Sequence, residues 1–175
     1  LTMEKLQTQS PRVINMIHLG EALTSLDPPV KALLVYNSNP LCVAPDASMV
    51  RKGLAREDLF TVVHEQVMTP TARFADLVLP ATTFLENRDL YTGYGHFYMG
   101  IADPVIEPRG ESISNFDFFQ TLARKMGFLD EPFSQSFDDR LQSYFNTMKE
   151  LPDGMSYEHY QPGDYVLSKR AAASG

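Results

Sequence analysis

A short apolar run at residues 32–36, Ala-Leu-Leu-Val-Tyr, constrains the fold of this chain more than any other feature. The run lacks the apolar–polar alternation of a strand with one face in water, and this pattern is typical of a parallel strand covered on both faces. It stops abruptly at the small polar residues Asn37, Ser38 and Asn39, which are followed by Pro40. In open α/β sheets, ligands bind where parallel strands end at their carboxyl edge. The run therefore predicts both a strand and the position of a binding site.

The same layout recurs twice further along the chain. Residues 60–65, Phe-Thr-Val-Val-His-Glu, form an apolar run that ends in His64 and Glu65. Residues 77–79, Leu-Val-Leu, end in Pro80 and then in alanine and two threonines. Three apolar strands that end in polar residues predict a candidate binding edge on one sheet.

Helix-start signals precede each predicted strand. Ser-Pro at residues 10–11 and Thr-Pro at residues 69–70 place a capping side chain before a proline suited to the first helical position, and Asp46 is a third cap. Helices that alternate with strands predict right-handed crossovers and a mainly parallel sheet, so the predicted fold class is α/β. The predicted helices cover residues 11–26, 47–54 and 71–75.

The pattern changes after Pro80. Residues 91–98 are aromatic and glycine-spaced, which predicts extended or hairpin structure. Two helices are then predicted, from Asn115 to a stop at Gly127 and over residues 137–148. No strong periodicity follows.

Charge and composition exclude several classes of protein. The formal charge of −7 and the lack of a Lys/Arg cluster argue against nucleic-acid binding. No apolar run approaches the about 18 residues that would span a membrane. Cys42 is the only cysteine, which rules out an internal disulfide, and we expect a small buried side chain rather than a nucleophile. No metal site is expected, because ligand spacing is missing among the histidines, His18, His64, His96 and His159.

Each candidate site residue has a functional and an ordinary interpretation. Thr69 and Thr71 can meet an anion at a helix start, or Thr69 can simply cap that helix. Asn37, Ser38 and Asn39 suit a ribose or a base edge, but the same residue types are common in turns. The glycine-rich phosphate loops G-x-G-x-x-G and the P-loop are absent from the sequence. The residues alone therefore predict an α/β ligand-binding domain and no more.

The order of the strand-end motifs resembles one domain of the dimethyl sulfoxide reductase family, the molybdopterin oxidoreductases. Within that family the motifs resemble those of the formate-dehydrogenase-like anaerobic dehydrogenases. The match runs over residues 11–128. It is carried by Val35-Tyr36-Asn37-Ser38-Asn39-Pro40, Val62-Val63-His64-Glu65, Met68-Thr69-Pro70-Thr71-Ala72 and Ala75-Asp76-Leu77-Val78-Leu79-Pro80-Ala81, and continues through Glu86, residues 91–95, Pro108, Gly110-Glu111 and Leu122-Ala123-Arg124 to Gly127.

In that family, molybdenum or tungsten is held by two molybdopterin guanine dinucleotides. The resemblance implies a Rossmann-like three-layer α/β/α domain over residues 1–130, with a C-terminal helical extension and tail at residues 131–175. This third domain of the enzyme would hold the guanosine-diphosphate end of one cofactor. The cofactor-binding residues implied are Asn37, Ser38, Asn39 and Pro40 around the nucleoside, His64 and Glu65 near the ribose, and Thr69 and Thr71 in the following turn.

The resemblance also implies what the chain lacks. The family's iron–sulfur cysteines and its molybdenum-ligating segment are missing, so the isolated chain is expected to be inactive, with no catalytic and no metal-binding residue of its own. The opening at Leu1, without a start methionine, and the Ala-Ala-Ala-Ser-Gly end are compatible with a piece of a longer polypeptide. The expected partners are the remaining domains of the parent enzyme and an electron-transfer subunit. We expect a cytoplasmic rather than a periplasmic location.

Two other functions stay open at this point. One is a stand-alone α/β module that binds a nucleotide or an anion. The other is a hydrolase that uses His64 and Glu65. The hydrolase is disfavoured because adjacent strand residues point to opposite faces and no nucleophile elbow is present.

Overall fold

The chain divides into two compact units, Leu1–Ala81 and Thr82–Gly175, and each is described by itself. The division predicted after residue 130 falls inside the second unit and stays a prediction. The structure is a computed structural model, and it describes residues 11–93, 98–147, 157–159, 163 and 165–167.

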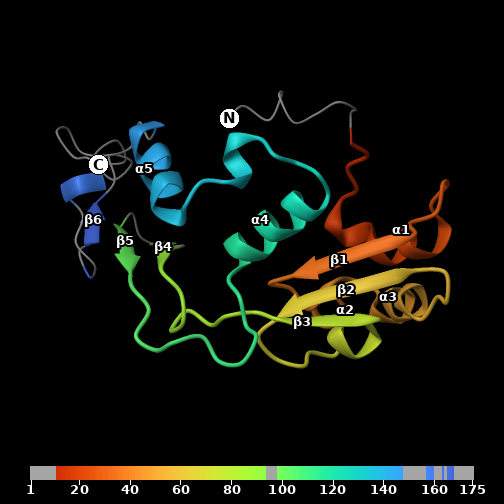
Figure 1. Ribbon diagram of the computed structural model, residues 1–175. Coiled ribbons are helices and arrows are strands. Elements are labelled where there is room, and N and C mark those ends of the chain that lie inside the picture. The colour runs from red at the N-terminus through yellow and green to blue at the C-terminus, as the bar shows by residue number, and fades with distance from the viewer. Residues whose placement is uncertain (1–10, 94–97, 148–156, 160–162, 164, 168–175) are drawn as a thin grey trace, which may run out of the picture. The chain divides into compact units, whose positions relative to one another are not determined.

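A three-stranded parallel sheet forms the centre of the first unit. Its strands are β1 (Ala32–Tyr36), β2 (Phe60–Glu65) and β3 (Leu77–Pro80), in the order β1-β2-β3. The register places Tyr36 beside His64 and His64 beside Leu79, so the carboxyl ends of the strands meet at one edge (Figure 1). The predicted α/β class with a mainly parallel sheet is confirmed.

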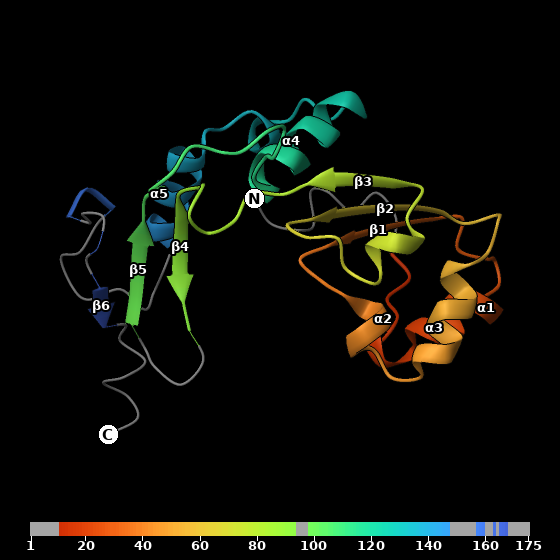
Figure 2. The same ribbon diagram turned by 90° about the horizontal axis from the view of Figure 1, so that it is seen from below.

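Helices cover one face of this sheet. Figure 2 shows α1 (Leu19–Ser25), α2 (Pro40–Val43) and α3 (Ala47–Leu54) on the same side of the strands. A Cβ added at Gly53 would lie 2.4 Å from Cβ of Leu23, so α1 and α3 are packed almost backbone to backbone. The buried cluster beneath the sheet consists of Leu23, Leu41, Val50, Leu54 and Leu59.

The opposite face of the sheet is apolar as well. Leu34, Tyr36 and Phe60 alternate with the residues that pack onto the helices, and they are 36%, 46% and 53% exposed. Leu33 and Val35, by contrast, pack into the helix-side clusters. The expectation that β1 is covered on both faces is therefore wrong for its outward-facing residues.

The first helix begins later than the sequence predicts. The residues from 11 to 15 are not helical, and a 3₁₀ turn, η2 (Met16–His18), leads into α1. Asn15 is the cap, because its side chain accepts a hydrogen bond from the second residue of that turn. The guanidinium of Arg12 donates to the carbonyl oxygen of Asp27 at 3.1 Å, which holds the extended segment beside the end of α1. The serine of the predicted cap lies outside the described residues.

The second unit contains an antiparallel sheet. Its strands are β4 (Asp89–Thr92), β5 (Tyr98–Ala102) and β6 (Tyr165–Leu167), in the order β4-β5-β6. Pairing of β4 with β5 confirms the extended structure predicted near residues 91–98, of which 94–97 lie outside the described part. The remaining elements are η3 (Ala72–Phe74) in the first unit, and α4 (Asn115–Lys125), η4 (Glu131–Phe133), α5 (Phe137–Thr147) and η5 (Tyr157–His159) in the second.

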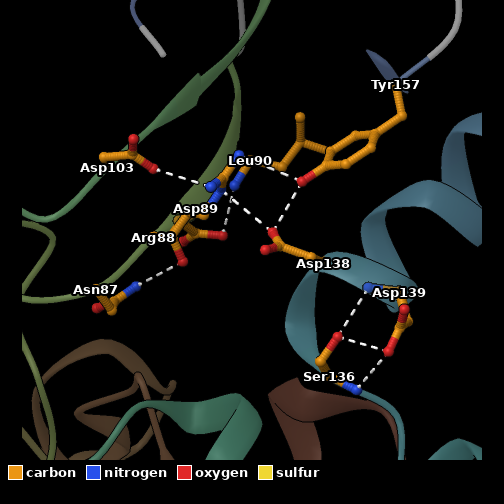
Figure 3. Close-up of polar contacts among 9 residues, drawn as sticks. All are labelled: Asn87, Arg88, Asp89, Leu90, Asp103, Ser136, Asp138, Asp139 and Tyr157. Atoms are coloured by element: carbon orange, nitrogen blue, oxygen red, sulfur yellow. Dashed lines mark hydrogen bonds and ion pairs between the residues drawn. The ribbon is translucent and has the colours of Figure 1, made fainter. Parts of the chain in front are cut away.

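A polar network around Arg88 ties the elements of this unit together (Figure 3). The Arg88 guanidinium lies 3.4 Å from carboxylate oxygens of both Asp103 and Asp138 and donates to the hydroxyl of Tyr157 at 3.2 Å. Tyr157 in turn donates to Asp138 at 2.8 Å, and burial raises the pKa of its hydroxyl. The start of β4, the end of β5, α5 and η5 are thereby joined. Beneath them, Leu141 and Phe145 of α5 pack against β5.

Candidate functional site

The turn after β1 presents polar side chains at the carboxyl edge of the parallel sheet. Asn37 has a positive φ of 48°, a left-handed conformation that asparagine tolerates better than most residues. Asn37 and Ser38 are both exposed, whereas Pro40 is buried as the first residue of α2. The backbone thus turns sharply at the strand end and leaves two polar side chains in solvent.

The loops that follow β1 and β2 are joined by a set of hydrogen bonds. The Thr71 hydroxyl, which is fully buried, donates to Oδ1 of Asn39 at 2.8 Å. The backbone N–H of Thr71 donates to the same oxygen at 3.3 Å. The Thr71 hydroxyl oxygen also accepts from the backbone N–H of Leu41 at 3.1 Å. Two of the predicted site residues, 32 positions apart in the sequence, are therefore in direct contact.

Thr69 serves the local turn. Its hydroxyl oxygen accepts from the backbone N–H of Ala72, the first residue of η3, at 3.1 Å. Because η3 spans only three residues, it offers no helix dipole of consequence to an anion. The ordinary interpretation of Thr69 as a cap agrees with this geometry.

His64 and Glu65 differ in their environments. His64 is fully buried, and this burial lowers the pKa of its imidazole, so the ring is neutral at pH 7. Glu65 is partly exposed, and its Oε1 accepts from the backbone N–H of Gln66 at 2.8 Å. As neighbours on one strand, the two side chains point to opposite faces of the sheet. The geometry gives no support to an acid–base pair.

A shallow hollow lies beside the turn after β1. Its volume is about 250 Å³, below the roughly 300–1,000 Å³ of complete small-molecule pockets. It has room for part of a ligand, such as one planar ring system. The lining is mainly apolar and consists of Met16, Leu19, Leu34, Val35, Tyr36, Ser38, Pro40, Val43 and Ala44.

Three further residues complete the description of this edge. Asp76 accepts from the backbone N–H of Thr61 at 2.7 Å, so its carboxylate pairs with a backbone donor of the neighbouring strand. Arg73, an exposed cation in η3, was missed by sequence reasoning, although it stands two positions after a predicted site residue. The expectation that Cys42 is buried is wrong, because the single turn of α2 directs Leu41 inward and leaves Cys42 exposed.

Neither a metal cluster nor a membrane span emerges from the described residues. Within that part of the chain, no three side chains of His, Cys, Asp or Glu gather as metal ligands do. None of the helices described there has the length and apolar character needed to cross a bilayer.

Comparison with known proteins decides the family. A family model named "Molybdopterin oxidoreductase" matches residues 10–125, about two thirds of the chain. The chain belongs to the molybdopterin oxidoreductase family. The resemblance carried by the strand-end motifs is therefore confirmed, and membership implies a molybdopterin cofactor.

Individual members of the family are similar over most of this chain. It is 51% identical over 131 residues to "Probable oxidoreductase YoaE" of Bacillus subtilis, covering 75% of this chain and 19% of YoaE. It is 33% identical over 124 residues to trimethylamine-N-oxide reductase of Haemophilus influenzae, covering 68% of this chain and 15% of that protein. The solved structure of acetylene hydratase from Pelobacter acetylenicus superposes with a TM-score of 0.69 at 33% identity, over 86% of this chain and 20% of that one. The chain thus spans about a fifth or less of the length of these relatives.

Proposed function

We propose that this chain is the cofactor-binding part of a bis-molybdopterin-guanine-dinucleotide oxidoreductase that uses molybdenum or tungsten. In this proposal it holds the guanosine-diphosphate end of one cofactor and does not turn over substrate alone. The proposed Rossmann-like domain covers residues 1–130, and residues 131–175 form its helical extension and tail. The parent enzyme is of the formate-dehydrogenase-like type.

The observation that carries the proposal is the contact between Asn39 and Thr71. It brings the loops after β1 and β2 together at the carboxyl edge of the sheet, where parallel α/β sheets bind ligands. Fold similarity alone does not locate a ligand, whereas this contact supports a site shared by these two loops.

The residues at this edge fit a nucleoside diphosphate. The side chains of Asn37 and Ser38 are exposed donors and acceptors for a ribose or a base edge. The apolar hollow beside Tyr36 and Pro40 suits the flat face of a base. The exposed guanidinium of Arg73 supplies a positive charge for a diphosphate.

The size of the hollow supports a shared binding site. A complete dinucleotide needs a larger cavity than about 250 Å³, so the remaining walls come from the other domains of the parent enzyme. When bound, the cofactor supplies the redox chemistry of its metal, and this chain positions the nucleotide end. The proposed partners are those domains and an electron-transfer subunit, and the proposed location is the cytoplasm.

Cofactor retention in the full-length enzyme tests the proposal. The double variant N37G/S38A removes two side chains that are exposed at the edge, and glycine at position 37 accepts the left-handed φ of 48° without strain. Loss of hydrogen bonds worth about 1–1.5 kcal/mol in total corresponds to roughly tenfold weaker retention. The measurement is the amount of GMP released by acid hydrolysis per mole of enzyme after extended dialysis. The control is K52A, which removes an exposed charge from α3; equal GMP content in wild type, control and double variant would contradict the proposal.

A further inference from the structure

Two large apolar residues occupy the centre of an exposed turn in the second unit. The backbone N–H of Glu86 donates to the carbonyl oxygen of Thr83 at 3.0 Å, so residues 83–86 form a β-turn with Phe84 and Leu85 at its two central positions. These two residues are 65% and 41% exposed. Central turn positions usually hold Gly, Pro, Asn, Asp or Ser, so the turn itself gives no reason for an apolar pair.

A second apolar pair lies beside this turn. The carbonyl oxygen of Leu85 accepts from the backbone N–H of Val105 at 2.9 Å and from that of Ile106 at 3.1 Å. Val105 and Ile106 are 72% and 42% exposed. Two loops that are distant in sequence therefore bring exposed apolar residues together, and Phe84, Leu85, Val105 and Ile106 form what we term the apolar patch.

A buried carboxylate holds the two loops in place. Glu86 accepts from the N–H of Thr83 at 2.7 Å and from its hydroxyl at 2.9 Å, and it also accepts from the N–H of Arg109 at 2.9 Å. Glu86 is buried while its neighbours Phe84 and Leu85 are exposed, which inverts the usual distribution of charged and apolar residues. Because these bonds already fix both loops, covering the patch adds little ordering cost.

We propose that the apolar patch is a docking surface for an apolar segment of the parent polypeptide outside residues 1–175. The inference goes beyond nucleotide binding, and it rests on the proposed function only in that both make this chain part of a longer enzyme. Exposed apolar residues grouped in one place are typical of surfaces that bind protein. The chain covers 19% of YoaE and 20% of the acetylene hydratase chain, so about four fifths of each relative has no counterpart in it.

Charge disfavours a second copy of this chain as the occupant. The second unit contains 14 Asp and Glu against 8 Lys and Arg, which gives it a formal charge of −6 out of the chain's −7. Two copies that docked through this unit would bring like charges together, which opposes association. A segment of the same polypeptide is tethered at high effective concentration, so a small apolar contact is enough to hold it.

Photo-cross-linking in the full-length enzyme tests the inference. p-Benzoylphenylalanine replaces Phe84, and in a control enzyme it replaces Lys52, an exposed residue of α3. Enzyme labelled with ¹⁴N and enzyme labelled with ¹⁵N are mixed before irradiation, and mass spectrometry identifies the linked peptides. We expect position 84 to link to a peptide of the same copy outside residues 1–175, at a yield roughly tenfold above position 52, because a tethered contact is occupied most of the time.

The other outcomes of this experiment contradict the proposal. Linkage to a peptide within residues 1–175, to a peptide of the other isotope or to another protein would each overturn it. Equal yields at positions 84 and 52 would overturn it as well.

Polar substitution of the patch separates docking from local folding. Because Phe84 is exposed in this chain, F84S should leave the urea midpoint of the chain unchanged. In the full-length enzyme, F84S should raise the rate of limited proteolysis roughly tenfold, since a buried Phe side chain shifts the docking equilibrium by at least that factor. F84L keeps an apolar side chain and should stay near the wild-type rate.

Two results of the substitutions would overturn the inference. One is a lower urea midpoint for F84S in the chain itself, and the other is a wild-type proteolysis rate for F84S in the full-length enzyme. Neither readout involves a nucleotide, so a failure here leaves the GMP test of the proposed function unaffected.

Discussion

The side chain of Asp76 offers the sharpest test of how the parallel sheet is held in register. Its carboxylate accepts from the backbone N–H of Thr61 at 2.7 Å, while its own N–H donates to the carbonyl oxygen of Thr61 at 2.9 Å. This pair extends the pairing of β2 with β3 by one step before β3 begins. Asp76→Ala removes the acceptor and leaves the N–H of a fully buried residue without its partner.

The structure gives the magnitude of the effect. A hydrogen bond to a charged acceptor contributes about 1.5–3 kcal/mol, and a buried donor left unpaired costs about 1–3 kcal/mol. Because Asp76 itself is exposed, water can partly replace its carboxylate at the Thr61 N–H. We therefore expect the free energy of unfolding to fall by about 2 kcal/mol in Asp76→Ala. Asp76→Asn keeps a neutral oxygen acceptor, so it should lose only about 1 kcal/mol.

Urea unfolding followed by far-ultraviolet circular dichroism measures both losses. With a denaturant slope of about 2 kcal/mol/M, Asp76→Ala should lower the midpoint by roughly 1 M and Asp76→Asn by about half as much. The asparagine variant is the matched control, since it differs from aspartate only in charge and in one donor group. If the two variants unfold together, or if neither differs from wild type, Asp76 does not support the sheet as described.

Two further predictions concern the core and the response to acid. Gly53→Ala places a Cβ 2.4 Å from Cβ of Leu23 and forces α1 away from α3, so we expect the free energy of unfolding to fall by about 1–2 kcal/mol. Thermal unfolding measures this change, and the exposed substitution K52A is the control that should leave stability unchanged. Equal melting temperatures of G53A and wild type would contradict the close packing of the two helices. Glu86 accepts hydrogen bonds from the Thr83 N–H, the Thr83 hydroxyl and the Arg109 N–H, and these bonds lower the pKa of its carboxyl group. The ionised carboxylate therefore stabilises the fold above pH 4.5, and this stabilisation is lost as the pH falls through the pKa of the folded state. Glu86→Gln should therefore unfold at lower urea than wild type at pH 7, with a difference that narrows below pH 4.5; a difference independent of pH would contradict this.

Local patterns in the sequence predicted most of the first unit. The apolar runs became β1, β2 and β3, and the Asp46 cap is confirmed because its side chain accepts from Met49 N–H at the start of α3. The same rules missed α2, although Asn39-Pro40 carries the cap-then-proline signal that was used elsewhere in the chain. They also placed the start of the first helix too early, at Ser-Pro in residues 10–11, whereas Asn15 caps the 3₁₀ turn η2 that leads into α1. Short-range signals identify candidates for helix starts, and tertiary contacts decide among them.

The meeting of the strand ends was predictable, but the contacts among the residues there were not. Parallel strands that end in polar residues predicted that these residues share one edge of the sheet, and the register of β1, β2 and β3 confirms this. The pairing of Asn39 with Thr71 spans 32 positions and depends on the register of β1 with β2, which local spacing does not determine. His64 is fully buried, and it is paired in the sheet with Tyr36 and Leu79, residues that are distant in sequence and that local spacing does not identify. The strand β6 had no sequence signal at all, because it consists of three residues in a stretch without periodicity.

The central claim is that the loops after β1 and β2 bind the guanosine-diphosphate end of the cofactor. Titration of the ¹⁵N-labelled chain with guanosine diphosphate, followed by two-dimensional NMR, tests it most directly. We predict that the backbone amide signals of the non-proline residues in 37–41 and 69–73 shift together with one dissociation constant, while the chemical shifts of α5 in the second unit do not change. Shifts confined to other parts of the chain, or none at millimolar ligand, would contradict it.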